Sequence, residues 1–246
     1  MGTLDGKTAI VTGAGRGLGR GIAEKLAAAG ATVAVTDIDE TTAKETADAV
    51  GGFAVATDVT SKESVDAMVA AVRERCGRID VLVNNAGWDV VGPFVDSDPG
   101  LWGKIMAINL YGVLHTCHAV LPLMAADGGG AVVNLASDAG RVGSSGEAVY
   151  AAAKGGVIAF TKTIAREHAR HGITANVVCP GPSDTPLFAS LGGDNPKLVE
   201  ALIRSIPLRR LAQPADIGAV VAFLASPEAE YVTGQTVSVS GGLTMS

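Results

Sequence analysis

Short apolar runs alternate along this chain with longer segments in which apolar residues recur every three or four positions. The short runs predict β-strands, and the longer segments predict the amphipathic helices between them. Strands that are apolar at almost every position are typical of a parallel sheet covered by helices on both faces. The runs place strands at Thr8–Thr12, Thr32–Thr36, Phe53–Ala56, Val81–Asn84, Ala131–Leu135, Thr174–Val178 and Thr236–Val239.

This alternation predicts an α/β fold in which residues 1–246 form a single domain, a doubly wound (Rossmann) three-layer sandwich with a seven-stranded parallel sheet. Two helix starts are marked by capping residues. Thr60-Ser61-Lys62-Glu63 predicts a capping box that begins at Thr60, and Asn195-Pro196 predicts a cap followed by proline in the first turn. Residues 182–213 form the one long connection, which predicts a substrate lid.

The composition narrows the class of protein. The residues are 48% apolar and only 4% aromatic, and 32 are glycine, which suits close packing of helices on a sheet. A net charge of −6 without a basic stripe argues against a nucleic-acid partner. Cys76, Cys117 and Cys179 form no C-x-x-C motif, and we find no signal-like start, no myristoylation pattern and no apolar run of ~20 residues. We therefore expect reduced thiols, no membrane association and a cytoplasmic location.

Tyr150 and Lys154 stand four residues apart, and Ser137 lies upstream of them. Residues at this spacing share one face of a helix, so the ammonium can lie near the phenol. A nearby positive charge favours the phenolate and lowers the tyrosine pKa, which makes a general base for a substrate hydroxyl. The same spacing also arises by chance on exposed helices, so the interpretation depends on motifs elsewhere in the chain.

The first predicted strand leads directly into Thr12-Gly13-Ala14-Gly15-Arg16-Gly17-Leu18-Gly19. Glycines between a strand and a helix let the backbone approach a pyrophosphate at the helix N-terminus. Gly6-Lys7-Thr8 resembles the end of a P-loop, but it precedes the strand and has Met1 where the leading glycine is required. The motif therefore indicates dinucleotide binding and excludes a nucleoside triphosphatase.

Asp37 ends the second predicted strand, about twenty residues after the glycines, where an acid accepts hydrogen bonds from the adenosine ribose. A carboxylate there repels a 2′-phosphate, so NAD is favoured over NADP. The alternative role for Asp37 is a helix cap, which Asp39 fills equally well. Arg16 argues for NADP, because its cation can meet a 2′-phosphate. Asp58-Val59 either lies beside the adenine or forms an ordinary turn.

With these motifs and those that follow, the chain resembles the short-chain dehydrogenase/reductase family along nearly its whole length. The glycines have the spacing T-G-x-x-x-G-x-G of that family, and its N-N-A-G motif closes the fourth strand at residues 84–87. The resemblance implies an enzyme that interconverts a secondary alcohol and a ketone with NAD or NADP. Further motifs follow in the family's order at Asn109, Ser137, Tyr150-x-x-x-Lys154, Pro180-Gly181 and Thr185.

The resemblance also implies a role for each motif. Tyr150 exchanges a proton with the substrate oxygen, and Ser137 binds that oxygen at hydride-transfer distance from the nicotinamide. Lys154 lowers the pKa of Tyr150 and holds the nicotinamide ribose, while Asn109 holds a water on a proton path. The implied cofactor-binding residues are Gly13, Arg16, Gly17, Leu18, Gly19, Asp37, Asp58, Val59, Asn85, Ala86, Gly87, Tyr150, Lys154, Pro180, Gly181 and Thr185.

The predicted substrate contacts are Trp88, Ser137, Arg141 and Glu147. Trp88 either offers a flat wall to a ring or packs between helix and loop. Arg141 either binds an acidic group or pairs with Glu147, and the sequence leaves both open.

Strings such as Asn85-Ala86-Gly87-Trp88-Asp89 and Ser137-Asp138-Ala139 resemble the branch of the family that oxidises 2-hydroxycyclohexanecarboxyl-CoA, a β-hydroxyacyl thioester, with NAD. Cations in the predicted lid either meet CoA phosphates or are solvated surface charges. These cations are Lys197, Arg204, Arg209 and Arg210.

The nearest alternative is an NADPH-dependent 3-oxoacyl-thioester reductase of fatty-acid synthesis, which shares the fold and the catalytic residues. A dinucleotide-binding regulator with a dead site would lack a catalytic residue, and none is missing. The pairs His115/His118 and His168/His171 have no acidic or cysteine partner at ligand spacing, so we expect no metal site. The family pairs its helices around residues 102–124 and 150–171 between subunits, which implies a homotetramer.

Overall fold

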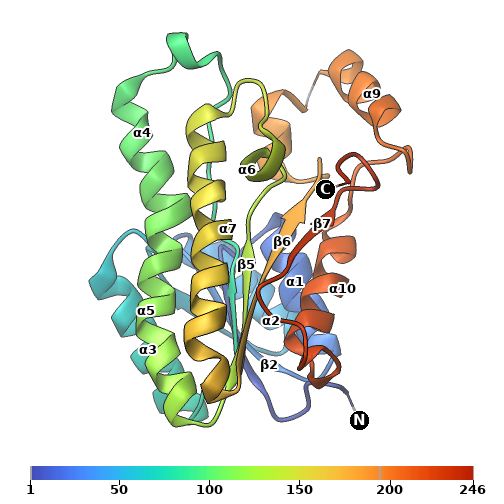
Figure 1. Cartoon of the computed structure of the whole chain (residues 1–246). Helices are drawn as coiled ribbons and strands as arrows, with labels where there is room; N and C mark the ends of the chain where they lie inside the picture. Colours follow the sequence, from blue (N-terminus) through green and yellow to red (C-terminus); the bar gives the residue numbers. More distant parts are fainter. Residues whose placement is uncertain (1, 194, 246) are drawn as a thin grey trace.

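The computed structural model describes residues 2–193 and 195–245. Its centre is a seven-stranded sheet of parallel strands in the order β3-β2-β1-β4-β5-β6-β7 (Figure 1). The doubly wound, single-domain fold predicted from the sequence is confirmed. The strands are β1 Thr8–Thr12, β2 Thr32–Asp37, β3 Phe53–Ala56, β4 Val81–Asn84, β5 Gly130–Leu135, β6 Ile173–Pro180 and β7 Thr236–Val239.

Helices cover both faces of the sheet. Helices α3, α4, α5 and α7 lie on one face, and α1, α2 and α10 lie on the other (Figure 1). The α-helices are α1 Gly17–Ala28, α2 Glu40–Val50, α3 Lys62–Cys76, α4 Pro99–Met106, α5 Gly112–Ala126, α6 Ala139–Val142, α7 Ala148–His168, α8 Pro186–Phe188, α9 Pro196–Ser205 and α10 Pro214–Ala225. Shorter turns are the 3₁₀ segments Phe94–Asp96, Ala169–His171 and Pro227–Ala229 and the π-helical segments Ala107–Tyr111 and Ala189–Gly193.

The central strands are mostly apolar because each of their faces meets a core. The edge strand β7, with the sequence TVSV and only partial burial, is the exception. Ile10 and Leu82 pack in the core under α3, α5 and α7, whereas Val11 and Val83 pack in the core under α1 and α10. Successive side chains of a strand point to opposite faces, so a strand covered on both sides has no polar face. This geometry explains why continuous apolar runs located the strands.

The sheet changes its direction of winding at β1, which pairs with β2 on one side and with β4 on the other. Ile10 of β1 lies opposite Ala34 and Leu82 in these two pairings. The crevice outside the carboxyl ends of the strands at such a point is where open α/β sheets bind ligands. The topology therefore places the ligand site beside the ends of β1 and β4.

Two predicted helix starts have different outcomes. The N-cap of α3 is Ser61, whose hydroxyl accepts the Ser64 N–H at 3.2 Å, so the prediction of a capping box at Thr60 is wrong. The Thr60 hydroxyl instead donates to Asp58 Oδ1 at 2.7 Å, because Asp58 captures it in a local turn. The predicted cap at Asn195 is confirmed, with Pro196 as the first residue of α9.

Residues Pro99–Ala126 form one continuous helical segment of 28 residues with a mean hydropathy of 1.3 in its most apolar window. Its length and composition are those of a membrane span, which the search for unbroken apolar runs missed. In the structure, Val113, Cys117 and Val120 of this segment are buried against the sheet. The segment is therefore placed as a core helix of the sandwich, although only 44% of that window is buried.

Candidate active site

The carboxyl ends of the strands open into a cleft of about 1280 Å³, and the glycine loop forms one wall of it. Helix α1 begins at Gly17 with Arg16 as its N-cap, and its first turn has no side-chain cap and no acidic residue. Its first amide N–H groups are thus available to an anion. A Cβ atom on Gly13 would lie 2.8 Å from Ala86 Cα, and one on Gly19 would lie 2.2 Å from Gly13 O. The loop consequently has room only for glycine at both positions.

Thr12 and Asn85 hold the glycine loop against the N-N-A-G turn. The Thr12 hydroxyl accepts the N–H groups of Asn85 and Ala86 at 3.0 and 3.1 Å. In return, Asn85 Nδ2 donates to Thr12 O and Gly13 O at 3.0 and 2.9 Å. These four hydrogen bonds join the ends of β1 and β4, so both motifs face the same cleft with a fixed separation.

Asp37 lies at the edge of the cleft, where its two oxygens accept the N–H groups of Gly15 at 2.9 Å and Asp39 at 3.1 Å. The cap of α2 is Asp39, which accepts the amides of Thr41 and Thr42. The choice between the two aspartates is thereby settled, because Asp39 alone caps the helix. Arg16 lines the same region of the cleft.

Lys154 is buried on α7, with 3% of its surface exposed, and its Nζ donates to Leu135 O at 2.9 Å. Burial lowers the pKa of Lys154 to about 8. The ammonium lies 5.4 Å from the centre of the Tyr150 ring. The motif has therefore brought the two side chains together as the helical spacing predicted.

The prediction that Lys154 lowers the pKa of Tyr150 is not met in the protein alone. Burial raises the pKa of Tyr150 well above its ordinary value, and the charges of Glu147 and Asp89 raise it further, while a hydrogen bond with Ser137 lowers it. The physical reason is that the ammonium is held by the Leu135 carbonyl beside the ring, so burial outweighs its attraction.

Asn109 is fully buried in the π-helical turn between α4 and α5, a feature often found at functional sites. Its Nδ2 donates to Trp88 O at 2.6 Å and Ile105 O at 2.9 Å, and its Oδ1 accepts the Trp88 N–H at 3.3 Å. Both amide hydrogens of the side chain are thus donated to backbone carbonyls, and the water-holding role stays a prediction. Asn109 fixes the chain just after the N-N-A-G turn.

The predicted substrate residues do not all reach the cleft. Trp88 and Glu147 line it, and the ammonium of Lys104 lies 4.0 Å from the centre of the Trp88 ring. Arg141 does not line the cleft, and it pairs with Asp138 at 3.3 Å and not with Glu147. The predicted pair with Glu147 is therefore wrong, because the acid three residues earlier is the nearest neighbour of Arg141 on the helical turn. The alternative that Arg141 binds an acidic group of a ligand stays a prediction.

Most other predicted residues line the cleft. Gly19 is the exception among the cofactor-binding residues, since it packs beneath the glycine loop, and Asn109 is the exception among the catalytic ones. The residues that line the cleft are Gly13, Arg16, Gly17, Leu18, Asp37, Asp58, Val59, Asn85, Ala86, Gly87, Ser137, Tyr150, Lys154, Pro180, Gly181 and Thr185.

The two ends of the segment 182–213 lie side by side and are joined by backbone hydrogen bonds. The Ala212 N–H donates to Pro182 O at 2.9 Å, and the Asp184 N–H donates to Ala212 O at 2.9 Å. Leu187 and Leu202 of this segment line the cleft. The paired ends and the apolar inner side agree with a cover over the cleft.

The residues beside the cleft that sequence reasoning missed include Ile38 and Asp89. Ile38 lines it with 74% of its surface exposed, and Asp89 is buried close enough to affect the pKa of Tyr150. No local pattern marks either residue, although Asp89 directly follows Trp88. Among the described residues, no group of three His, Cys, Asp or Glu side chains is placed to hold a metal ion.

Comparison with known proteins identifies the family. A family model described as Enoyl-(Acyl carrier protein) reductase matches residues 13–244. The 3-oxoacyl-[acyl-carrier-protein] reductase FabG of Vibrio cholerae is 42% identical over 98% of this chain and 99% of its own length. The oxidoreductase UcpA of Salmonella typhimurium is 41% identical over 100% of this chain and 97% of its own. The crystal structure of levodione reductase has a TM-score of 0.94 and 36% identity, covering 97% of this chain and 98% of that chain. The chain therefore belongs to the short-chain dehydrogenase/reductase family and is an NAD(P)-dependent oxidoreductase of the ketoreductase and alcohol dehydrogenase type.

Proposed function

We propose that the protein uses NAD(H) to interconvert a secondary alcohol and a ketone, and that its substrate is a β-hydroxyacyl thioester such as 2-hydroxycyclohexanecarboxyl-CoA. The observation that carries the choice of NAD is the position of Asp37. Its carboxylate is fixed at the edge of the cleft by the N–H groups of Gly15 and Asp39. The N-cap of α2 is Asp39, so Asp37 is not needed as a helix cap. A fixed anion there accepts ribose hydroxyls and repels a 2′-phosphate.

The cleft fits a dinucleotide. The uncapped start of α1 and the glycine-only loop suit a pyrophosphate, because both offer backbone N–H groups without a side chain in the way. We assign Lys154 to the nicotinamide ribose and Pro180, Gly181 and Thr185 to the carboxamide. Asp58 and Val59 would lie beside the adenine. When bound, the nicotinamide supplies the site that accepts or donates the hydride.

Three side chains then handle the proton and the substrate oxygen. The raised pKa of Tyr150 keeps its phenol protonated at neutral pH, which suits donation to a carbonyl during reduction. Ser137 holds the same oxygen, since its hydroxyl is already in contact with Tyr150. Lys154 remains mostly charged below its pKa of about 8, so it favours any negative charge that forms on Tyr150 during oxidation. Asn109 acts through the backbone of Trp88 as a positioning residue.

The acyl thioester is supported by the walls of the cleft. Trp88 presents an aromatic face to a ring, and the segment 182–213 would close over the bound substrate as a lid. Of its cations, Arg210 pairs with Asp216 at 2.5 Å and Arg204 pairs with Glu200 at 3.4 Å. Those two pairs leave Lys197 and Arg209 as our candidates for CoA phosphates.

A second candidate is a 3-oxoacyl-[acyl-carrier-protein] reductase. The name of the Vibrio cholerae relative favours it, at 42% identity over nearly the full length of both chains. This reaction uses the same proton chemistry at Tyr150 and Ser137. It differs in the carrier of the acyl group and, as we expect, in a preference for NADPH.

Initial rates with NAD and NADP separate these candidates. The alcohols to compare are 2-hydroxycyclohexanecarboxyl-CoA, 3-hydroxybutyryl-CoA and a cyclic alcohol without the thioester. A preference for NAD with the ring thioester fastest supports the first proposal. A preference for NADP refutes the argument from Asp37 and favours the carrier-protein reductase. Turnover of only the free alcohol removes CoA from the proposal.

We also propose a homotetramer. The segment Pro99–Ala126 is as apolar as a membrane span, yet only 44% of its most apolar window is buried within one chain. Tyr111 on this segment is 52% exposed, and α7 runs beside it (Figure 1). An apolar surface that is only partly buried, on two neighbouring helices, suits contact with the same surface of another subunit. Light scattering after size-exclusion chromatography measures the mass in solution and tests the tetramer.

We also propose a cytoplasmic location. The free thiols Cys76, Cys117 and Cys179 support it, because the cytosol keeps thiols reduced.

A further inference from the structure

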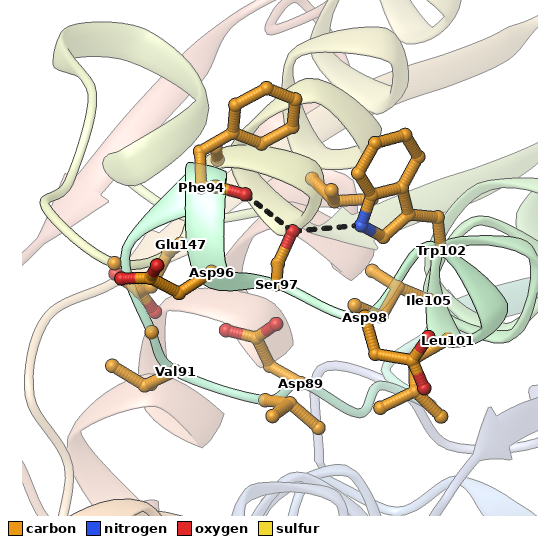
Figure 2. A pocket seen from close by; sticks show the side chains of 15 residues that line it. Asp89, Val91, Phe94, Asp96, Ser97, Asp98, Leu101, Trp102, Ile105 and Glu147 are labelled. Carbon is orange, nitrogen blue, oxygen red and sulfur yellow. Dashed lines mark hydrogen bonds between the residues drawn. The ribbon is translucent and has the colours of Figure 1, made fainter.

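A second, smaller cavity of about 170 Å³ (Figure 2) shares lining residues with the large cleft. It is enclosed by the chain after Trp88, by the start of α4 and by the turn before α7. The Gly92 N–H donates to Gly146 O at 2.9 Å, which joins the two loops over the cavity. Val91 and Glu147 line both this cavity and the large cleft. A molecule in the small cavity would therefore be a neighbour of the reacting centre.

The small cavity is lined by four acidic side chains, and none of its described lining residues is Lys, Arg or His. Asp98 uses Oδ1 to accept the Gly100 N–H at 2.8 Å. Glu147 precedes α7 but makes no capping hydrogen bond with its side chain. The remaining two are Asp89 and Asp96. No described residue that lines the cavity therefore carries a positive charge to balance these four carboxylates.

Asp89 is the most informative of these acids. It is only 4% exposed, and neither carboxylate oxygen has a hydrogen-bond partner among the described residues. The Val90 N–H lies near it without completing a hydrogen bond, and Lys154, which also attracts it, is bonded to Leu135 O. Burial raises the pKa of Asp89 to about 6, and Glu147 adds to this rise. Figure 2 shows the Asp89 carboxylate pointing into the cavity toward Ser97.

Most of the remaining wall is apolar. Leu101, Ile105 and Val149 contribute aliphatic surface. Trp102 stacks on Phe94 with 5.3 Å between ring centres, and its indole N–H donates to Ser97 Oγ at 3.0 Å. A buried carboxylate is costly unless a cation or a donor meets it. The aliphatic surface around it suits a ligand whose positive end carries short hydrocarbon groups.

We propose that this cavity binds the ammonium group of a small organic amine, with the Asp89 carboxylate as its counter-ion and the aliphatic wall as the contact for its carbon atoms. A neutral molecule of the same shape leaves the carboxylate without its charge partner, and an anion is repelled by the four acids. The cavity has space for only a few non-hydrogen atoms. The ammonium belongs either to a separate small amine or to one end of an amino alcohol whose hydroxyl lies in the cleft.

Calorimetric titration of the full chain at neutral pH tests the proposal, with propylammonium chloride as the probe and 1-propanol as its neutral counterpart. We expect saturable binding of propylammonium and none of 1-propanol. Asp89→Asn should weaken propylammonium binding at least about tenfold. Asp48→Asn, which removes the same charge from the exposed face of α2, is the matched control and should bind like the wild type. Leu101→Phe, which fills part of the cavity, should weaken binding independently of charge.

Two results would overturn the proposal. Equal binding of propylammonium by the wild type and Asp89→Asn would mean that the carboxylate is no counter-ion. An equal heat with potassium chloride at the same ionic strength would mean that only general screening is measured.

If binding is confirmed, turnover of 1-amino-2-propanol with an increased KM in Asp89→Asn assigns the ammonium to a substrate. Binding of propylammonium without such turnover assigns it to a separate ligand. The binding readout does not depend on the proposed thioester activity.

Discussion

Replacing Lys154 with Met tests the argument from burial most directly. The Lys154 side chain is 3% exposed, and burial lowers its pKa from 10.5 to about 8. One pKa unit corresponds to about 1.4 kcal/mol. Keeping this ammonium charged therefore costs the folded protein about 3 kcal/mol at neutral pH, relative to the unfolded chain. Methionine has a similar length and carries no charge, so the variant does not have this cost.

The sign of the pH dependence follows from where each state takes up its proton. As the pH falls from 10.5 to about 8, the unfolded chain protonates Lys154 first, so the free energy of unfolding decreases. Below about 8 both states are protonated, and the full cost is present. The free energy of unfolding of Lys154→Met, minus that of the wild type, should be about 2–3 kcal/mol larger near pH 7 than near pH 10. The lost hydrogen bond to Leu135 O lowers the stability of the variant at both pH values and cancels from this comparison.

Urea unfolding of the cofactor-free protein, followed by circular dichroism at both pH values, measures this difference. Lys162→Met is the matched control, because Lys162 is exposed on the same helix and its ammonium is solvated. The control should differ from the wild type by the same small amount at both pH values. A Lys154→Met difference that does not change with pH would refute the reasoning, since it would mean that the ammonium is not desolvated.

Three further predictions follow from the site. Tyr150→Phe should lower turnover by about 10²–10⁴-fold, because it removes the proton donor, while NADH binding measured by fluorescence stays nearly unchanged; a loss of binding would instead give Tyr150 a structural role. Asp37→Ser should shift kcat/KM toward NADP by at least about tenfold, and an unchanged ratio would remove Asp37 from cofactor selection. Gly19→Ala should lower the free energy of unfolding by about 1–3 kcal/mol and weaken NADH binding, since its Cβ would lie 2.2 Å from Gly13 O. Thermal unfolding and NADH titration measure both effects. Gly103→Ala is the control, because a Cβ there meets nothing within 4 Å, and an equal loss of stability and binding in this variant would contradict the steric argument.

The sequence by itself determined the layered fold and most of the strand boundaries. Strands β1, β3, β4 and β7 have the predicted bounds. For β1 and β4 the reason is that a strand buried on both faces is apolar along most of its length. The glycine loop and the N-N-A-G turn could also be located, because a close backbone approach requires glycine and leaves a recognisable spacing in the sequence. Their positions at strand ends placed both on one edge of a parallel sheet.

Only the tertiary structure decided how the charged and polar side chains of the site behave. Arg141 pairs with Asp138, Asn109 holds the backbone of Trp88, and the pKa of Tyr150 is raised instead of lowered. The outcomes for Asn109 and Tyr150 depend on which distant segments pack around these side chains, whereas Arg141 takes the nearer of two acids close to it in the sequence. Helical spacing brought Lys154 to Tyr150, but it carries no information on the burial of the phenol or on the charge of Asp89, which comes from another loop. Desolvation and long-range contacts are properties of the packed molecule, so no local pattern of residues encodes them.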